Sequence, residues 1–364
     1  MEARRPRAER TARKGDQRIP TAGSAGPEAL ALVNPSVAQR VQTRRRIVVT
    51  VLGTLAVSGA LAYELAGRRG QFGTALLTAP LWVLLLAALF HLTSLLTRSE
   101  AWKICVHAAG GSVSRRVLFR AAGFGSLASV LSAQLGVAAR ISALRRSAPQ
   151  TAPRIPALIA AEVPILAVEA MLAALFMFTL VGPLDLPAWV PVIVIAAMLA
   201  LVVAIANLAR RRRSGLWQGL AAMRELRGRG RLITFVVLGV IAQIARNWLI
   251  LHAVGVNASV FDAIAVLIVT VSLSPLPIGP SVGAAATVLI LGAHGIAATA
   301  AGGVLLTVTG IFGALCFAGW AFGDRALASV RNARGLRGAP VAAIAAIAPI
   351  GSPTAELNLL APSS

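Results

Sequence analysis

Long runs of apolar residues dominate the middle of the chain. A helix needs about 20 consecutive apolar residues to cross the hydrocarbon core of a bilayer, and runs of this length therefore predict membrane spans. We expect an all-α polytopic membrane protein with about six full spans. The six runs are residues 47–66, 74–97, 157–182, 188–209, 232–253 and 296–322.

Two further apolar segments are weaker than these six. Segment 121–138 is rich in Gly, Ser and Ala, and segment 259–294 is interrupted by three prolines between Ser274 and Pro280. Neither has an uninterrupted apolar run of spanning length. We expect each segment to be either a broken span or a re-entrant hairpin.

Composition separates the ends of the chain from its middle. The 364 residues are 57% hydrophobic and 13% charged, with a mean hydropathy of +0.77, which is too apolar for a typical soluble domain. Residues 1–44 are rich in Arg, Pro, Gly and Ala and have too few large apolar side chains to fold alone. We expect a disordered basic tail at 1–44, a transmembrane domain at 45–324 and a low-complexity tail at 325–364.

The formal net charge of +22 is concentrated in the tails and the short loops. Nucleic-acid binding needs a basic face on a folded domain, so we expect no nucleic-acid partner. Basic residues of short loops are retained on the cytoplasmic side. If segments 121–138 and 259–294 both enter the membrane and return to the same side, all the Arg clusters lie on the cytoplasmic side, except for Arg68 and Arg69. Both termini of this multi-pass cell-membrane protein are then cytoplasmic.

The same topology predicts an inverted repeat. Its first half comprises 74–97, 121–138 and 157–182, and its second comprises 232–253, 259–294 and 296–322. Transporters with such repeats bind substrate near the midplane, where broken helices expose backbone groups. A short sequence beginning at Gly136 is echoed at Gly283, which is equally consistent with small-residue helix packing.

Few charged or strongly polar residues lie inside the predicted spans, and these residues are the first candidates for a site. Glu162 and Glu169 are seven residues apart and therefore share one face of a predicted helix. Gln243, Arg246 and Asn247 form a polar stripe on a later span. We expect Glu169 to lie opposite Arg246 as an intramembrane ion pair.

Arginine suits a lipid phosphate because its planar guanidinium offers paired donors. One interpretation is that Arg140 and Arg246 contact such a phosphate while the glutamates balance the charge. The other is that Arg246 and Glu169 pair only structurally and that Arg140 is an ordinary loop arginine. The sequence leaves both open. The lipid-binding candidates are Arg140, Glu162, Glu169, Gln243, Arg246 and Asn247.

The proline-rich segment predicts a break in the helix at membrane depth. Three prolines in six residues cannot continue a helix, and they leave backbone groups without partners. Such a break either binds a ligand or only turns the chain. The residues of this broken-helix motif are Gly136, Pro275, Pro277, Gly279, Pro280 and Gly283.

Two stretches carry a family resemblance. Leu131–Arg140 reads LSAQLGVAAR, and Leu273–Gly295 reads LSPLPIGPSVGAAATVLILGAHG. They resemble the Pro-x-x-x-Gly-Glu-x-x-Arg and Leu-Pro-x-x-Pro-Gly-Gly-x-Gly-x-x-Glu segments of the transmembrane, flippase-like domain of lysylphosphatidylglycerol synthases and their stand-alone relatives. Glu162 falls where that family commonly carries a Glu-Arg pair. The resemblance covers about residues 47–323.

This resemblance implies binding or translocation of an anionic lipid, either a phospholipid or a polyprenyl-linked lipid, without a cofactor. The chain departs from the family at Val137, Val163 and Ala286, where the family has glutamate, arginine and glutamate. Fused relatives also carry a soluble synthase domain. We expect none here, and therefore no lipid-modifying reaction.

Two other functions stand as alternatives. One is a non-transporting membrane scaffold for an envelope-lipid or glycan synthesis protein or for a second copy of the chain. The other is an intramembrane transferase acting on a lipid phosphate, which would need clustered carboxylates to hold Mg²⁺. The aspartates are too widely separated for this, and the cysteines have no metal-ligand or disulfide spacing, so we expect no enzyme and no metal site. These residues are Asp16, Asp185, Asp262, Asp324, Cys105 and Cys316.

Overall fold

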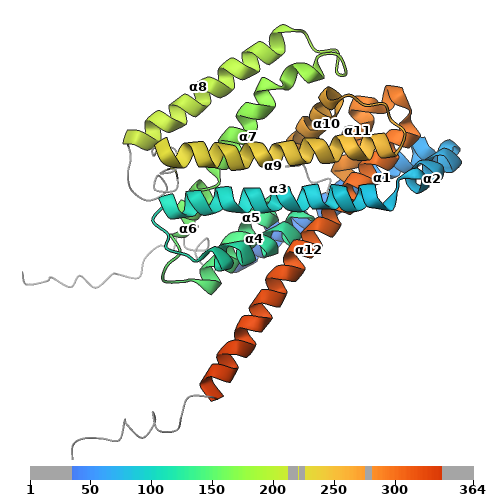
Figure 1. The fold of residues 1–364 in the computed structure, drawn as a ribbon. Helices are drawn as coiled ribbons and strands as arrows, with labels where there is room; N and C mark the ends of the chain where they lie inside the picture. The colour runs from blue at the N-terminus through green and yellow to red at the C-terminus, as the bar shows by residue number, and fades with distance from the viewer. Residues whose placement is uncertain (1–34, 212–219, 221–225, 275–280, 338–364) are drawn as a thin grey trace, which may run out of the picture. The chain divides into compact units, whose positions relative to one another are not determined.

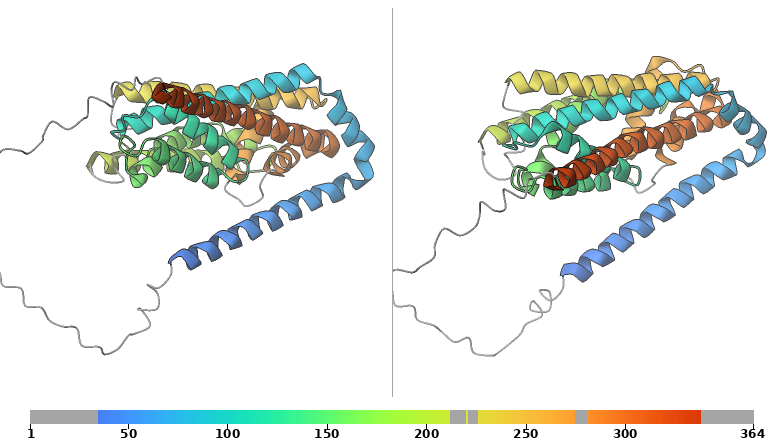
Figure 2. Two further views of the ribbon diagram at one scale, coloured as in Figure 1. Left: turned by 90° about the horizontal axis from the view of Figure 1, so that it is seen from below. Right: turned by 60° about the horizontal axis from the view of Figure 1, so that its bottom comes forward.

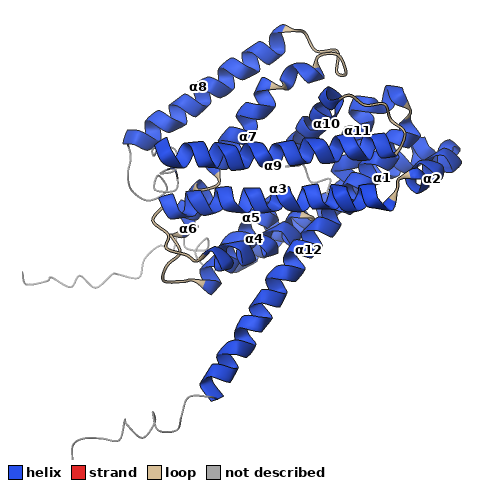
Figure 3. Cartoon of the chain, in the orientation of Figure 1, coloured by secondary structure: helices blue, strands red, loops and turns tan. Residues whose placement is uncertain are grey.

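The computed structural model describes residues 35–211, 220, 226–274 and 281–337, and this part contains helices and no strand (Figure 3). The all-α fold class is therefore confirmed for the described residues. Pro275, Pro277, Gly279 and Pro280 lie outside them. The α-helices are α1 (Pro35–Leu65), α2 (Arg69–Thr78), α3 (Leu81–Ala108), α4 (Arg115–Ser129), α5 (Ala133–Ser147), α6 (Ile155–Ala160), α7 (Val163–Leu175), α8 (Trp189–Arg211), α9 (Leu226–Ala253), α10 (Val260–Leu273), α11 (Val282–Leu291) and α12 (Ile296–Arg337) (Figure 1).

The chain divides into two compact units, Met1–Val48 and Val49–Ser364. The described part of the first unit is the beginning of α1, which starts inside the predicted N-terminal tail. At the other end, α12 continues to Arg337, past the predicted start of the C-terminal tail. The remainder of both predicted tails lies outside the described residues.

Five helical segments of the described chain are long and apolar enough to cross a membrane, consistent with a helical membrane protein. They overlap five of the six predicted spans. The sixth, 47–66, lies within α1 and is not among them. The five segments are Leu81–Ala108, Ile155–Leu175, Trp189–Leu208, Arg229–Ala253 and Ile296–Leu327.

Prolines move the boundaries of two predicted spans. The predicted span 74–97 is wrong at its start, because α2 ends at Thr78 and α3 begins after Pro80. Proline cannot donate a backbone N–H and holds its predecessor in an extended conformation, and Ala79 has ψ of 114°. Pro164 stands in the first turn of α7, where the helix restarts after a short break behind α6.

The two weaker apolar segments each form a pair of short helices. Ser132 caps α5 by accepting a hydrogen bond from the N–H of Leu135 at 3.2 Å, and Ser259 and Asp262 form a capping box at the start of α10. Helices α4 and α5 pack closely on each other, and α10 packs on α11. Both α10 and α11 are too short to cross a bilayer alone.

Helices α3 and α9 lie side by side and are antiparallel (Figures 1 and 2). The direction follows from their contacts, since Gly239 of α9 faces Thr97 of α3 and Arg246 faces His91. Helix α12 packs on both of them and on α4 and α11. Helix α8 packs on α7 and leaves almost all of its most apolar stretch exposed.

Two hydrophobic clusters occupy opposite ends of the α3–α9 pair. One contains Ala87 of α3 with Ile250 of α9, together with apolar residues of α10, α11 and α12. The other contains Trp102 of α3 with Val236 of α9, together with residues of α4 to α7. The polar residues between the two clusters therefore lie where α3 and α9 meet in the interior.

Candidate functional site

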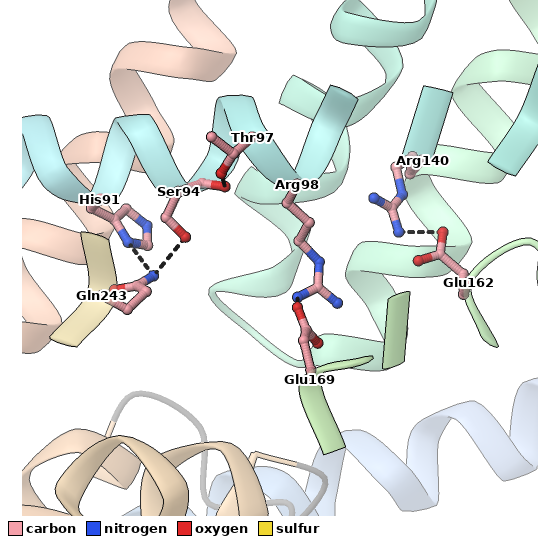
Figure 4. Close-up of polar contacts among 8 residues, drawn as sticks. All are labelled: His91, Ser94, Thr97, Arg98, Arg140, Glu162, Glu169 and Gln243. Atoms are coloured by element: carbon pink, nitrogen blue, oxygen red, sulfur yellow. Dashed lines mark hydrogen bonds and ion pairs between the residues drawn. The ribbon is translucent and has the colours of Figure 1, made fainter. Parts of the chain in front are cut away.

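One face of α3 carries three polar side chains between the two hydrophobic clusters. His91, Ser94 and Arg98 are spaced by three and four residues and therefore share a face of the helix (Figure 4). Sequence reasoning missed this face because the predicted span ends at residue 97, just before Arg98, and His91 was not among the candidate residues. Their helical spacing was the available signal, but it depends on continuing α3 past Arg98.

His91 and Gln243 begin a hydrogen-bonded group between α3 and α9. Arg246 is only a donor, so its 3.2 Å bond to Oε1 of Gln243 fixes how that amide is turned. The amide nitrogen then donates to Nδ1 of His91 and to Oγ of Ser94, each at 3.2 Å (Figure 4). His91 therefore accepts hydrogen bonds from α9 at Nδ1.

The guanidinium of Arg246 completes the group. Its Nη1 also donates to Nδ1 of His91 at 3.3 Å, and its Nη2 donates to Oγ1 of Thr309 at 3.0 Å and to the carbonyl of Leu306. Only 7% of Arg246 is exposed. Three helices thus meet at this side chain. We call His91, Ser94, Gln243, Arg246 and Thr309 the Arg246 cluster.

Glycines make room for these polar side chains. A Cβ atom on Gly310 would lie 3.1 Å from Nη2 of Arg246, and one on Gly313 would lie 2.8 Å from Cδ2 of His91. Both glycines are on α12. On α9, a Cβ on Gly239 would lie 2.8 Å from Oγ1 of Thr97. The close approach of α3, α9 and α12 around the cluster therefore requires residues without side chains.

No carboxylate in the described part of the chain forms an ion pair with Arg246. The predicted pair with Glu169 is wrong, because Glu169 pairs with Arg98 of α3 instead (Figure 4). Glu169 shares its helix face with Glu162, which pairs with Arg140 of α5. Among the described residues, the buried positive charge of Arg246 is therefore stabilised by neutral acceptors.

Asn247 does not join the cluster. It is 5% exposed, and its amide donates to the carbonyl of Ala263 in α10 at 3.4 Å. Adjacent helix residues point about 100° apart, so Asn247 faces α10 while Arg246 faces α3 and α12. The predicted polar stripe is therefore divided: Gln243 and Arg246 belong to the Arg246 cluster, and Asn247 contacts α10.

Arg140 is the centre of a second polar group. It lies in α5 with 8% exposure, and it forms a buried ion pair with Glu162 (Figure 4). Its guanidinium also lies 4.5 Å from the ring centroid of Trp102, which is fully buried. The interpretation of Arg140 as an ordinary loop arginine is wrong. We call Trp102, Arg140 and Glu162 the Arg140 cluster.

The predicted glycines are packing positions. A Cβ on Gly136 would lie 2.7 Å from Cβ of Ser129, and one on Gly283 would lie 3.0 Å from Oγ1 of Thr307. Gly136 thus allows α5 to approach α4, and Gly283 allows α11 to approach α12. Close helix contact through small residues accounts for both positions.

Two cavities lie away from both clusters. One of about 570 Å³ is lined by Arg68, Gln71 and the start of α12, and another of about 710 Å³ is lined by Gln71, α2 and the end of α9. No predicted site residue borders either of them. Among the described residues, no group of three or more His, Cys, Asp or Glu side chains is placed to hold a metal ion.

Comparison of the chain with the known protein families, with curated proteins and with solved structures found no match.

Proposed function

We propose that this protein binds an anionic lipid, either a phospholipid or a polyprenyl-linked lipid, and translocates it across the bacterial cytoplasmic membrane. The observation that carries the proposal is the buried guanidinium of Arg246, which has no carboxylate partner in the described chain. In this proposal, the chain is a relative of the transmembrane domain of lysylphosphatidylglycerol synthases.

The energetics of a buried charge support a ligand at Arg246. Inserting an arginine at the centre of a membrane helix costs about 2.5–3.5 kcal/mol on insertion scales. Arginines at this depth are therefore found mainly at functional sites. Hydrogen bonds to neutral acceptors solvate the guanidinium but leave its net charge in place. A lipid phosphate would neutralise this charge, and the planar guanidinium matches its oxygens.

The arrangement of helices supports an inverted repeat with two re-entrant hairpins. Helices α3 and α9 are antiparallel, and each of them contacts both α7 and α12. Each is followed along the chain by a pair of short helices and then by α7 or α12. In this proposal, the Arg246 cluster lies near the repeat axis, where inverted-repeat transporters hold their substrates.

Charge placement supports the orientation. Arg115, Arg116 and Arg145 belong to the loops and helix ends of the first hairpin, and Arg210 and Arg211 end α8. Short basic loops are retained in the cytoplasm. The proposed topology puts these ends and both termini on the cytoplasmic side of the cell membrane. In this proposal, the lipid is exchanged with the cytoplasmic leaflet of the bilayer.

A reconstitution assay tests the proposal. The purified protein is placed in liposomes with a fluorescent phosphatidylglycerol, and dithionite bleaching reports lipid that has crossed the bilayer. We expect faster crossing than in protein-free vesicles, and Arg246→Gln should slow the protein-dependent rate at least about tenfold, the loss expected for a charge-assisted contact of about 1.5–3 kcal/mol. Arg246→Lys should retain part of the rate because the charge stays.

Arg145→Gln is the matched control. Arg145 also donates to a backbone carbonyl, that of Ala152 at 3.2 Å, but it lies at the end of α5, away from the Arg246 cluster. Its substitution should leave the rate unchanged. If wild-type rates equal those of empty vesicles across several anionic headgroups, the proposed transport function is wrong. If a folded Arg246→Gln protein keeps the full rate, Arg246 has no role in transport.

A further inference from the structure

The ion pair between Arg98 and Glu169 is partly exposed to solvent, whereas the pair between Arg140 and Glu162 is buried. The side chains of Arg98 and Glu169 are 39% and 21% exposed, compared with 9% and 6% for Arg140 and Glu162. Both pairs join α3 or α5 to the α6–α7 region (Figure 4). Only the first pair can therefore be reached from outside the helix packing.

Arg98 also lies at one end of the apolar part of α3. The preceding residues 81–97 contain no Asp, Glu, Lys or Arg and extend for about 26 Å at 1.5 Å per residue, close to the thickness of a hydrocarbon core of about 30 Å. Arg98 therefore falls near a headgroup layer. His91, which contacts Arg246, is seven residues earlier on the same face and hence about 10 Å deeper.

We propose that Arg98 is the first contact of a lipid phosphodiester with the protein and that Glu169 is its built-in competitor. The headgroup displaces Glu169 from Arg98 and then moves about 10 Å deeper along the α3 face to Arg246. This inference rests on the proposed lipid translocation and adds to it the site at which the lipid is received.

The chemistry of the pair suits such an exchange. A guanidinium has five N–H donors, and the one hydrogen bond that the structure records from Arg98 goes to Glu169. A phosphodiester anion can therefore approach the remaining donors before the carboxylate leaves. Because Glu169 is partly exposed, water can solvate it after displacement. Replacement of one anion by another keeps the charge of the site constant.

Ser94 and Gln243 lie between Arg98 and Arg246. Ser94 lies between Arg98 and His91 on the same face of α3, and its hydroxyl contacts the amide of Gln243. That amide in turn contacts Arg246. A phosphate leaving Arg98 would thus meet hydrogen-bonding groups until it reaches the second guanidinium.

Competition makes an unusual prediction, because removal of the two partners has opposite effects. The probe is a short-chain phosphatidylglycerol, titrated into the detergent-solubilised full chain with binding followed by calorimetry. Arg98→Gln should weaken binding about fivefold, since a partly exposed, solvent-screened contact with the phosphate is lost. Glu169→Gln should strengthen binding about threefold, since Arg98 no longer has a competing carboxylate.

The pair Arg115 and Glu100 provides the matched controls. It is another partly exposed pair that joins α3 to a neighbouring helix. Glu100 lies two residues past Arg98 on α3 and also pairs with Lys103. Arg115→Gln and Glu100→Gln should leave the affinity unchanged. Glycerophosphoglycerol, which has the same phosphodiester anion without acyl chains, should bind at least about tenfold more weakly because no apolar contact accompanies it.

The outcomes separate this inference from the proposed function. Weaker binding in both Arg98→Gln and Glu169→Gln, or no change in either, would overturn the competition. Equal binding of glycerophosphoglycerol would overturn the assignment to a lipid headgroup. If wild-type liposomes show no translocation while the opposite shifts appear, the receiving site stands and the transport function fails. If translocation occurs and is unchanged in Arg98→Gln, the transport function stands and the receiving site fails.

Discussion

Arg140 and Arg246 are buried to nearly the same extent, with 8% and 7% exposure, yet only Arg140 has a carboxylate partner in the described chain. The guanidinium of Arg140 is matched by Glu162 and covered by Trp102. That of Arg246 has a histidine, an amide, a hydroxyl and a carbonyl around it. Burial alone therefore does not distinguish the roles of the two arginines, whereas the balance of charge does.

In the proposed function, the difference separates a structural charge, that of Arg140, from one that binds a ligand, that of Arg246. Removing one partner of a buried ion pair leaves the other charge buried where neither water nor a ligand can solvate it. Such a substitution therefore destabilises the protein. Removing a charge that is already uncompensated relieves a cost, so its loss should affect ligand binding more than folding. The predictions below test this contrast, from the largest expected effect to the smallest.

Glu162→Gln should have the largest effect. It leaves the guanidinium of Arg140 buried without its anion, and breaking such a pair typically costs about 3–5 kcal/mol. We expect the free energy of unfolding, measured by SDS titration in mixed micelles, to fall by about 3 kcal/mol. The double variant Arg140→Met with Glu162→Leu should recover most of this loss. A single variant as stable as wild type would mean that the pair does not hold the fold.

Gly125→Ala should destabilise the Arg140 region by about 2 kcal/mol. The added Cβ would lie 2.8 Å from Cβ of Arg140 and 2.9 Å from the carbonyl oxygen of Gly136, and neither of these atoms can move without the backbone. Thermal unfolding in detergent measures the change. An unaltered unfolding temperature would show that α4 and α5 separate more easily than their contacts indicate.

Arg246→Met should leave the free energy of unfolding nearly unchanged or raise it, in contrast to Glu162→Gln. Because the substitution removes a charge that no carboxylate of the described residues balances, we expect the free energy of unfolding to stay within about 1 kcal/mol of wild type or to rise. The same SDS titration used for Glu162→Gln gives a direct comparison. A loss of about 3 kcal/mol would assign Arg246 the same structural role as Arg140 and would erase the contrast.

Gly310→Ala should have the smallest effect on folding and a selective effect on transport. Its Cβ would lie 3.1 Å from Nη2 of Arg246, the far end of a flexible side chain, so the guanidinium can shift at a cost below about 1 kcal/mol. We expect a several-fold slower translocation rate in liposomes with nearly unchanged stability. Equal losses of stability in this variant and in Gly125→Ala would contradict the prediction.

The apolar runs predicted the helical membrane character because run length is a property of the sequence alone. Boundaries were predicted less well. Pro80 moves the start of one predicted span from residue 74 to Leu81, and α3 continues past the predicted end at residue 97 to Ala108. An apolar run shows that a helix is embedded, but a helix can extend beyond the run when neighbouring helices pack on it.

The ion pairs could not be predicted, because they depend on which helices pack together. Glu162 and Glu169 share a face, as their spacing indicated, and both find arginines, one on α5 and one on α3. Their partners are set by the tertiary packing of α7, which no local pattern encodes. His91 was missed for the same reason, since its role appears only when α9 is placed beside α3.

The contact between Arg246 and a lipid phosphate can be measured directly by solid-state NMR. The protein, with ¹⁵N-labelled arginine side chains, is reconstituted with phosphatidylglycerol, and ³¹P dephasing of the guanidinium nitrogens reports distances within a few ångströms. Our account predicts guanidinium dephasing that weakens in Arg246→Lys, where only Arg98 and other arginines still contact lipid phosphate, and that stays unchanged in Arg145→Gln. The same dephasing in the wild type and in Arg246→Lys would contradict the claim that Arg246 holds the lipid.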